Sequence, residues 1–119
     1  MAPLDVVLNE QRALIVQPDL FFISTEQSWI VQDRVRGAPD LVIDVLSPKP
    51  RIGQTAERIR WFQENGVREC WLVHRDEPSV TVIEFTDRRE ASRRVFGRRE
   101  SIVSAVLPEF TSSLEEMLA

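Results

Sequence analysis

The sequence predicts an α/β (α+β) domain in which a mixed central β-sheet is flanked by helices. Short apolar runs rich in β-branched and aromatic residues recur along the chain, and one segment between them has the three- and four-residue spacing of an amphipathic helix. The chain has 119 residues, of which 43% are hydrophobic and 29% charged. This is the size and composition of one globular unit, so residues 1–119 are assigned to a single domain.

The first part of the chain is predicted to be mostly extended. Residues 4–8 and 13–16 flank a polar turn and predict a β-hairpin, and residues 20–23 predict a further strand. Residues 41–46 are apolar at both alternating sets of positions, which is typical of a central strand covered on both faces. Asp44 is the one polar residue in that strand, and its presence there needs a physical reason.

A helix is predicted after the central strand. Ile52, Ala56, Ile59 and Phe62 recur at spacings of three and four residues, so they would share one face of a helix. Gly66 stands where a glycine commonly follows the C-terminus of a helix.

The last part of the chain predicts a hairpin, an edge strand and a short helix. Residues 70–73 and 80–83 are separated by a turn and predict the hairpin. The arginine-rich residues 87–99 predict an edge strand with its loops. Ser112 or Ser113 is expected to cap the final helix, whose first turn would carry two glutamates.

The charge and cysteine content limit the partners and the compartment. The net charge is −4, so any polyanion would have to be met by a local basic surface. Fourteen of the fifteen basic residues are arginine, and the single lysine is Lys49. The single cysteine, Cys70, cannot form an internal disulfide, and no apolar run approaches the roughly 20 residues of a membrane helix. We therefore expect a cytoplasmic protein with no membrane partner.

Three aspartates form the chemical pattern of the sequence. Asp40, Val42 and Asp44 would lie on one face of the central strand, and Asp19 would join them if its strand pairs alongside. Converging carboxylates make a hard oxygen site suited to Mg²⁺, with Mn²⁺ as a second option. Such an ion can neutralise a scissile phosphate and activate water. The pattern therefore points to phosphodiester hydrolysis.

A structural interpretation stands beside this one. Asp19 and Asp40 both follow proline, and an aspartate in such a turn commonly accepts hydrogen bonds from neighbouring backbone amides. Asp44 differs, because a carboxylate inside an apolar strand costs several kcal/mol unless it is paired or bound to a metal. For Asp44 the functional interpretation is favoured.

Four segments occur in order along nearly the whole chain: residues 2–8 (APLDVVL), 17–20 (QPDL), 37–48 (GAPDLVIDVLSP) and 65–73 (NGVRECWLV). In these segments the chain resembles the Uma-two family of restriction-endonuclease-like proteins, also known as domain of unknown function eight-twenty. The resemblance implies the PD-(D/E)XK nuclease fold and a Mg²⁺-dependent, DNA-cleaving activity.

The resemblance also assigns roles to residues. Asp19 would match the first acidic position and Asp44 the second, where the family usually has glutamate, and Asp40 matches the proline-aspartate pair before it. The family's lysine lies early in the helix after the strand, and here that position is Arg58. Arginine keeps the charge, but it does not readily release a proton.

Two further basic residues enter through the resemblance. Lys49, just past the end of the strand, would replace the family's lysine from another direction, and the alternative is an ordinary surface lysine. Arg51, together with Arg58, is expected to contact the phosphates of a nucleic acid. The rival hypothesis is a catalytically inactive nuclease fold that binds nucleic acid or a protein partner.

Family members usually carry an additional N-terminal portion, which this sequence lacks. We expect it to be a short form or a fragment that is missing the acidic residue of that portion. A sheet that lacks a strand exposes an edge, so we also predict a homodimer.

Other features receive structural interpretations or remain open. Six arginines form either a basic stripe for phosphates or the solvated face of an edge strand: residues 88, 89, 93, 94, 98 and 99. Trp29, Trp61 and Trp71 are predicted to be core or interface anchors. His74 has no second histidine or cysteine pair nearby, so a strand-end role is favoured over metal binding.

Overall fold

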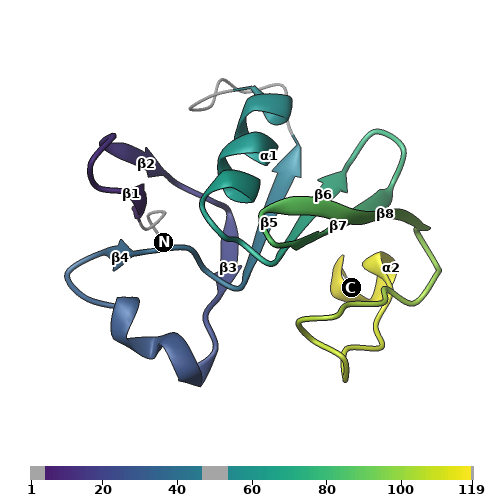
Figure 1. The fold of residues 1–119 in the computed structure, drawn as a ribbon. Helices are drawn as coiled ribbons and strands as arrows, with labels where there is room; N and C mark the ends of the chain where they lie inside the picture. Colours follow the sequence, from purple (N-terminus) through teal and green to yellow (C-terminus); the bar gives the residue numbers. More distant parts are fainter. Residues whose placement is uncertain (1–4, 47–53, 119) are drawn as a thin grey trace.

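A computed structural model describes residues 5–46 and 54–118. It contains two β-sheets, two α-helices and a 3-10 helix (Figure 1). The predicted mixed α/β architecture is confirmed. Lys49, Arg51 and Ile52, which were singled out from the sequence, lie outside the described residues.

The larger sheet has five strands in the order β3-β5-β6-β7-β8. The central strand β5 pairs antiparallel with β3 and parallel with β6, so the sheet is mixed. The antiparallel pairs β6–β7 and β7–β8 complete it. The strands are β3 (Leu20–Phe22), β5 (Leu41–Leu46), β6 (Glu69–His74), β7 (Ser79–Thr86) and β8 (Arg89–Gly97).

The predicted N-terminal hairpin forms, but it belongs to a second sheet. Strands β1 (Val6–Asn9), β2 (Leu14–Val16) and β4 (Val35–Arg36) make a three-stranded sheet in the order β2-β1-β4. Ala13 has φ +53 and belongs to the turn, so the second strand begins one residue later than expected. The 3-10 helix η1 (Thr25–Ile30) and β4 were not predicted, because neither has a distinctive pattern.

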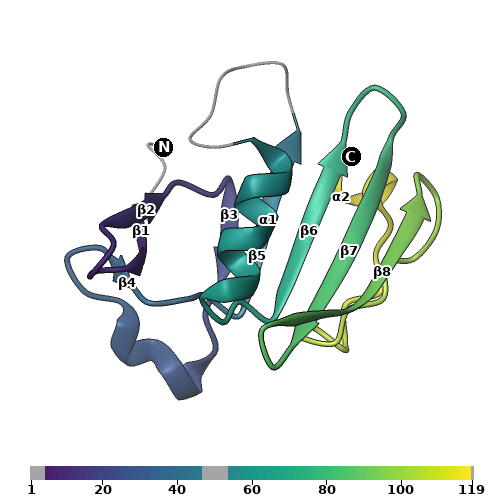
Figure 2. The ribbon, with the colours of Figure 1, turned by 45° about the horizontal axis from the view of Figure 1, so that its top comes forward.

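Helix α1 (Thr55–Glu64) covers one face of the larger sheet, and α2 (Leu114–Leu118) lies on the opposite face (Figures 1 and 2). Gly66 follows α1 with φ +93, as predicted for a residue after the helix C-terminus. Ser113 caps α2, since its hydroxyl accepts a hydrogen bond from the Glu116 amide and Glu116 accepts one from the Ser113 amide. None of the helices in the described ranges is long and apolar enough to cross a membrane.

Each face of the larger sheet has its own apolar core. The α1 side joins the larger sheet, the smaller sheet and the helix, with Val42, Phe62, Cys70 and Ile83 among its buried residues. The opposite core joins the sheet to the segment that follows β8, and Trp71 is its largest buried side chain. The central strand is therefore covered on both faces, as its sequence predicts.

A buried glutamate fastens the segment after β8 to the sheet. Glu69 is fully buried and accepts hydrogen bonds from the Trp71 indole at 2.7 Å, from the Ser104 hydroxyl and from the Ala105 amide at 2.9 Å. Four acceptor directions on one carboxylate allow these contacts to coexist. Phe110 then packs edge-on against Trp71, with ring centroids 5.3 Å apart. No pattern in the sequence predicts that Glu69 is buried.

Candidate active site

Asp44 and Arg58 form a buried ion pair between strand β5 and helix α1. The side chain of Asp44 shares the α1 face of the strand with Val42 and Leu46. Arg58 Nε donates to Asp44 Oδ2 at 2.9 Å, and Arg58 Nη2 donates to Asp44 Oδ1 at 3.3 Å. The two residues are only 2% and 3% exposed, respectively. The aspartate in the apolar strand therefore has a charged partner on the helix that covers it.

The geometry of the pair is the one that makes a buried charge tolerable. A guanidinium presents parallel N–H donors that match the two oxygens of a carboxylate. Arg58 also lies over the ring of Phe62, with its central carbon 5.7 Å from the ring centroid, and Phe62 is fully buried one helical turn further along α1. The ring and the carboxylate together hold the guanidinium in place.

Asp19 reaches the same end of β5 from the neighbouring strand. Leu20 pairs with Ile43 in the β3–β5 ladder, so Asp19 precedes that ladder on the side of Asp44. The Asp19 Oδ2 atom accepts a hydrogen bond of 2.7 Å from the Val45 amide. Asp19 is exposed, whereas Asp44 is buried. Asp19 and Asp44 therefore lie on neighbouring segments, as the predicted strand pairing requires, and Arg58 joins them through its contact with Asp44.

Asp40 lies elsewhere and holds a loop. It precedes Asp44 by four residues along an extended strand, which separates their Cα atoms by roughly 13 Å. Its carboxylate accepts hydrogen bonds from the Ser24 amide at 2.6 Å, from Gln27 Nε2 at 2.8 Å and from Arg68 Nη1 at 3.3 Å. These contacts fasten the start of η1 to the sheet, which is the structural role given above as the alternative for Asp40.

The hydrogen bonds also change the acidity of Asp40. Burial acts to raise the pKa of its carboxyl group, but the hydrogen bonds from Ser24, Gln27 and Arg68 outweigh burial and hold the pKa below the ordinary value of 3.8. Asp40 is therefore a carboxylate in the folded protein at neutral pH.

Two carboxylates remain as candidate ligands of a metal ion. Within residues 5–46 and 54–118, no group of three or more histidine, cysteine, aspartate or glutamate side chains is arranged to hold a metal. Mg²⁺, however, takes oxygen ligands and needs only one or two carboxylates from a protein. Asp19 and Asp44 offer carboxylate oxygens of the kind that such an ion takes, and Arg58 would share Asp44 with it.

Other predicted features lie outside this site. His74 is the last residue of β6, where its Nε2 is 2.9 Å from the Thr81 hydroxyl, and the strand-end position is confirmed. Three of the six arginines pair with glutamates, namely Arg93 with Glu90 and both Arg98 and Arg99 with Glu115. Strand β8 is an edge strand, as predicted.

The three tryptophans have different environments. Trp71 is buried in the core opposite α1, Trp61 is partly buried against the α1-side core, and Trp29 is exposed. A core role for Trp29 is therefore wrong, and its role as an interface anchor remains a prediction.

Comparisons with known proteins give a family and a structural relative for this chain. A family model described as a putative restriction endonuclease matches residues 3–115. Among solved structures, the chain is similar to a putative nuclease belonging to DUF820 from Anabaena variabilis ATCC 29413, with 22% sequence identity and a TM-score of 0.65. The similarity covers 87% of this chain and 59% of the Anabaena chain, so this chain spans less than two thirds of the length of that protein. No curated protein matches.

The buried ion pair predicts a non-additive effect on stability. Asp44→Ala and Arg58→Ala should each lower the free energy of unfolding by about 3–5 kcal/mol, because each leaves the other charge buried without its partner. The double variant Asp44→Leu/Arg58→Met should lose less than either, because it buries no charge. Urea unfolding measures all three. Glu90→Ala, which breaks the exposed pair with Arg93, should cost less than about 1 kcal/mol. Additive losses in the double variant would contradict the prediction.

The contacts of Asp40 predict a pH-dependent contribution to stability. The folded-state pKa lies below the unfolded-state pKa, so the contribution is complete above pH 3.8 and is lost as the pH falls through the folded-state pKa. Asp40→Asn should cost about 1–3 kcal/mol at neutral pH, and the difference from wild type should narrow below pH 3.8.

Urea unfolding across this pH range tests the prediction. Asp87→Asn is the control, because Asp87 sits in an exposed turn at φ +52, a conformation that asparagine also adopts. A difference between wild type and Asp40→Asn that stays constant with pH would count against it.

Proposed function

This chain belongs to the Uma2 family of restriction-endonuclease-like proteins, and on that premise we propose that it is a Mg²⁺-dependent DNA endonuclease, with Mn²⁺ as an effective substitute. The observation that carries the proposal is the convergence of Asp19, Asp44 and Arg58 at one end of the central strand. Two acids from neighbouring segments of the sheet and an arginine from the covering helix are brought to this part of β5, although they lie far apart in the sequence.

Asp19 and Asp44 are the proposed metal ligands. When bound, the ion would neutralise the scissile phosphate and lower the pKa of a bound water. Asp44 would supply a fixed oxygen, since its orientation is set by two hydrogen bonds from Arg58. Asp19 would supply an oxygen from the exposed side, where substrate arrives. Asp40 would support both acids indirectly by fastening the loop after β3 to the start of β5.

Arg58 is best supported as a positioning residue. Its guanidinium is almost fully buried and engaged with Asp44, which favours orientation of the acid over contact with a phosphate. The phosphate contacts are then proposed for Lys49 and Arg51, which precede α1 in the sequence. Arginine stays protonated, so a proton removed from water would have to pass to another group.

A second candidate function has one observation in its favour. The bidentate ion pair with Arg58 engages both oxygens of Asp44, whereas a lysine would offer a single compact charge. A catalytically silent nuclease fold that binds nucleic acid or a protein partner would keep such a pair for stability alone. The two functions differ in the response to Arg58→Lys.

We further propose a cytoplasmic homodimer. Strand β3 is an edge of the larger sheet, and its side chains Leu20 and Phe22 are exposed. An edge strand with exposed apolar side chains is a surface on which a second strand can pair. The two acids of each copy would then lie next to the interface, because Asp19 immediately precedes the same strand.

Cleavage assays test the nuclease proposal. The wild-type chain should nick plasmid DNA in Mg²⁺ or Mn²⁺ and not in EDTA, and Asp44→Asn should abolish the nicking. Arg58→Lys should raise the rate by about tenfold or more, because an amine can exchange a proton and leaves Asp44 less engaged. The matched control Asp87→Asn should cleave as wild type does.

The outcomes separate the two functions. Cleavage by Arg58→Lys alone would assign the wild-type chain to the silent form. Absence of cleavage from both proteins, with no Mn²⁺ bound by either, would remove the nuclease proposal.

Sedimentation velocity tests the homodimer. At micromolar concentration the wild-type chain should sediment with twice the monomer mass of 13.7 kDa. Leu20→Lys places a charge on the edge strand and should shift the population to monomer, whereas Val103→Lys, at an exposed position after β8, should not. A wild-type monomer would refute the proposal.

A further inference from the structure

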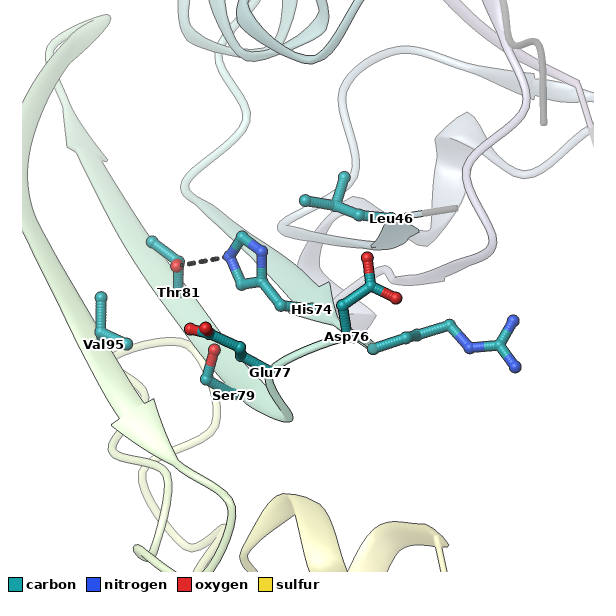
Figure 3. A pocket seen from close by; sticks show the side chains of 8 residues that line it. Leu46, His74, Asp76, Glu77, Ser79, Thr81 and Val95 are labelled. Atoms are coloured by element: carbon teal, nitrogen blue, oxygen red, sulfur yellow. Dashed lines mark hydrogen bonds between the residues drawn. The ribbon is translucent and has the colours of Figure 1, made fainter. Parts of the chain in front are cut away.

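A cavity of about 910 Å³ lies beside the β6–β7 hairpin (Figure 3). Its size is within the range of small-molecule binding sites. It does not include any of the three residues that converge at the candidate active site. The residues that line it are Leu46, His74, Arg75, Asp76, Glu77, Ser79, Thr81 and Val95.

The cavity adjoins the candidate active site along the central strand. Leu46 follows Asp44 by two residues, so both side chains lie on the α1 face of β5 at a spacing of roughly 7 Å. His74 is the register partner of Leu46 on β6 and continues the same face. A nucleotide strand whose phosphate lies near Asp44 would therefore bring a neighbouring nucleotide to the cavity.

The walls of the cavity suit a flat apolar group. Leu46 and Val95 are its two aliphatic side chains, and Figure 3 shows them on opposite sides of His74 and Thr81. Val95 is 62% exposed, although it stands opposite the buried Thr81 in the β7–β8 ladder. The imidazole of His74 is held by its contact with the Thr81 hydroxyl and presents a fixed ring to the cavity. A planar ligand would cover Val95 and stack on His74.

The polar groups of the cavity determine which hydrogen-bonding groups the edge of a planar ligand should carry. Asp76 and Glu77 make no side-chain hydrogen bond or ion pair within the described part of the chain, and ionised carboxylates only accept hydrogen bonds. Figure 3 shows the Glu77 carboxylate near Ser79 and Thr81 and the Asp76 carboxylate turned toward Leu46. With two acids and one arginine in its lining, the cavity disfavours a phosphate and favours N–H donors.

We propose that this cavity binds an unpaired nucleobase that carries an exocyclic amino group, with cytosine as the best fit, next to the scissile phosphate. The inference rests on the proposed nuclease function for the placement of that phosphate. Carboxylates accept from the cytosine N4 amino group, whereas thymine presents the O4 acceptor at the corresponding place and would be repelled. A base can enter such a cavity only when it is out of the duplex stack, so the substrate class is single-stranded or locally unpaired DNA.

Binding without cleavage tests the cavity. Fluorescence anisotropy in EDTA compares labelled oligodeoxycytidine with oligothymidine of equal length on the full chain. Wild type should bind the cytidine strand at least about fivefold more tightly. Glu77→Gln should reduce that preference to less than about twofold, because one acceptor becomes an amide that can also donate. Val95→Trp should fill the cavity and remove the preference by a second route. Thermal unfolding verifies that each variant is folded.

A control variant and the outcomes that would overturn the proposal complete the test. Glu109→Gln, an exposed glutamate in the segment before α2, should keep the wild-type preference. An equal affinity of wild type for the two strands, or a preference that survives both cavity variants, overturns the proposal. Binding of a lysine-rich peptide that Glu77→Gln weakens, with DNA binding unchanged, also overturns it and assigns the cavity to a basic peptide. Because EDTA prevents cleavage, loss of the base preference is distinguishable from failure of the nuclease proposal, which is read from nicking.

Discussion

A carboxylate and a guanidinium buried against each other fix how helix α1 lies on strand β5. Burying the Asp44 carboxylate in an apolar strand has a desolvation cost that a charged, well-aligned partner offsets. Arg58 can be that partner because α1 crosses the strand in the observed position. The apolar contacts of Phe62 set the depth of the helix, and the ion pair sets its rotation and its translation along the strand. The fold and the candidate site therefore share one contact.

The other face of the sheet uses a buried acid differently. Glu69 has no basic partner in its cluster and is satisfied by an indole, a hydroxyl and a backbone amide. Its contacts join segments of the chain more than thirty residues apart, but the groups that donate to it are an indole, a hydroxyl and an amide, and none of them is an exposed acid. Asp44 instead has the exposed Asp19 beside it on the next strand. Burial of an acid alone is thus a poor guide to chemistry in this protein, and the neighbouring exposed acid is what distinguishes the two faces.

Much of the larger sheet is predictable from local pattern, because its elements are long and their surroundings uniform. Residues 41–46 are apolar on both faces and proved to be covered on both, and the glycine after α1 has the positive φ expected there. The smaller sheet was missed as a separate unit, since β4 is two residues long and pairs with a strand nearly thirty residues away. Pairing at that distance leaves no periodic signal in the sequence.

The positions of the site residues could be predicted from the sequence better than their hydrogen bonds and ion pairs. Alternation along β5 places Asp44 on the α1 face, and antiparallel pairing with β3 brings Asp19 to it. Arg58 was identified from a motif as a residue for phosphates, yet its depth and its bidentate pairing with Asp44 emerge only from the packing of α1. Asp40 shares a face and a motif with Asp44, but it accepts hydrogen bonds from Ser24 and Gln27. No sequence pattern predicts the loop that contains these two donors.

The hydrogen bonds that join Glu69 to Ser104 and Ala105 have a consequence for folding during synthesis of the chain. Every strand of the larger sheet precedes Ser104 in the sequence, so a ribosome releases all of them before the residues that cover Trp71. Until then the sheet can close its α1 side, while the opposite side remains an open apolar surface whose central carboxylate lacks its hydrogen bonds from Ser104 and Ala105. A chain in which that segment is not yet docked would present an open apolar face, and such a face favours chaperone capture and sheet-to-sheet aggregation over completion of the fold.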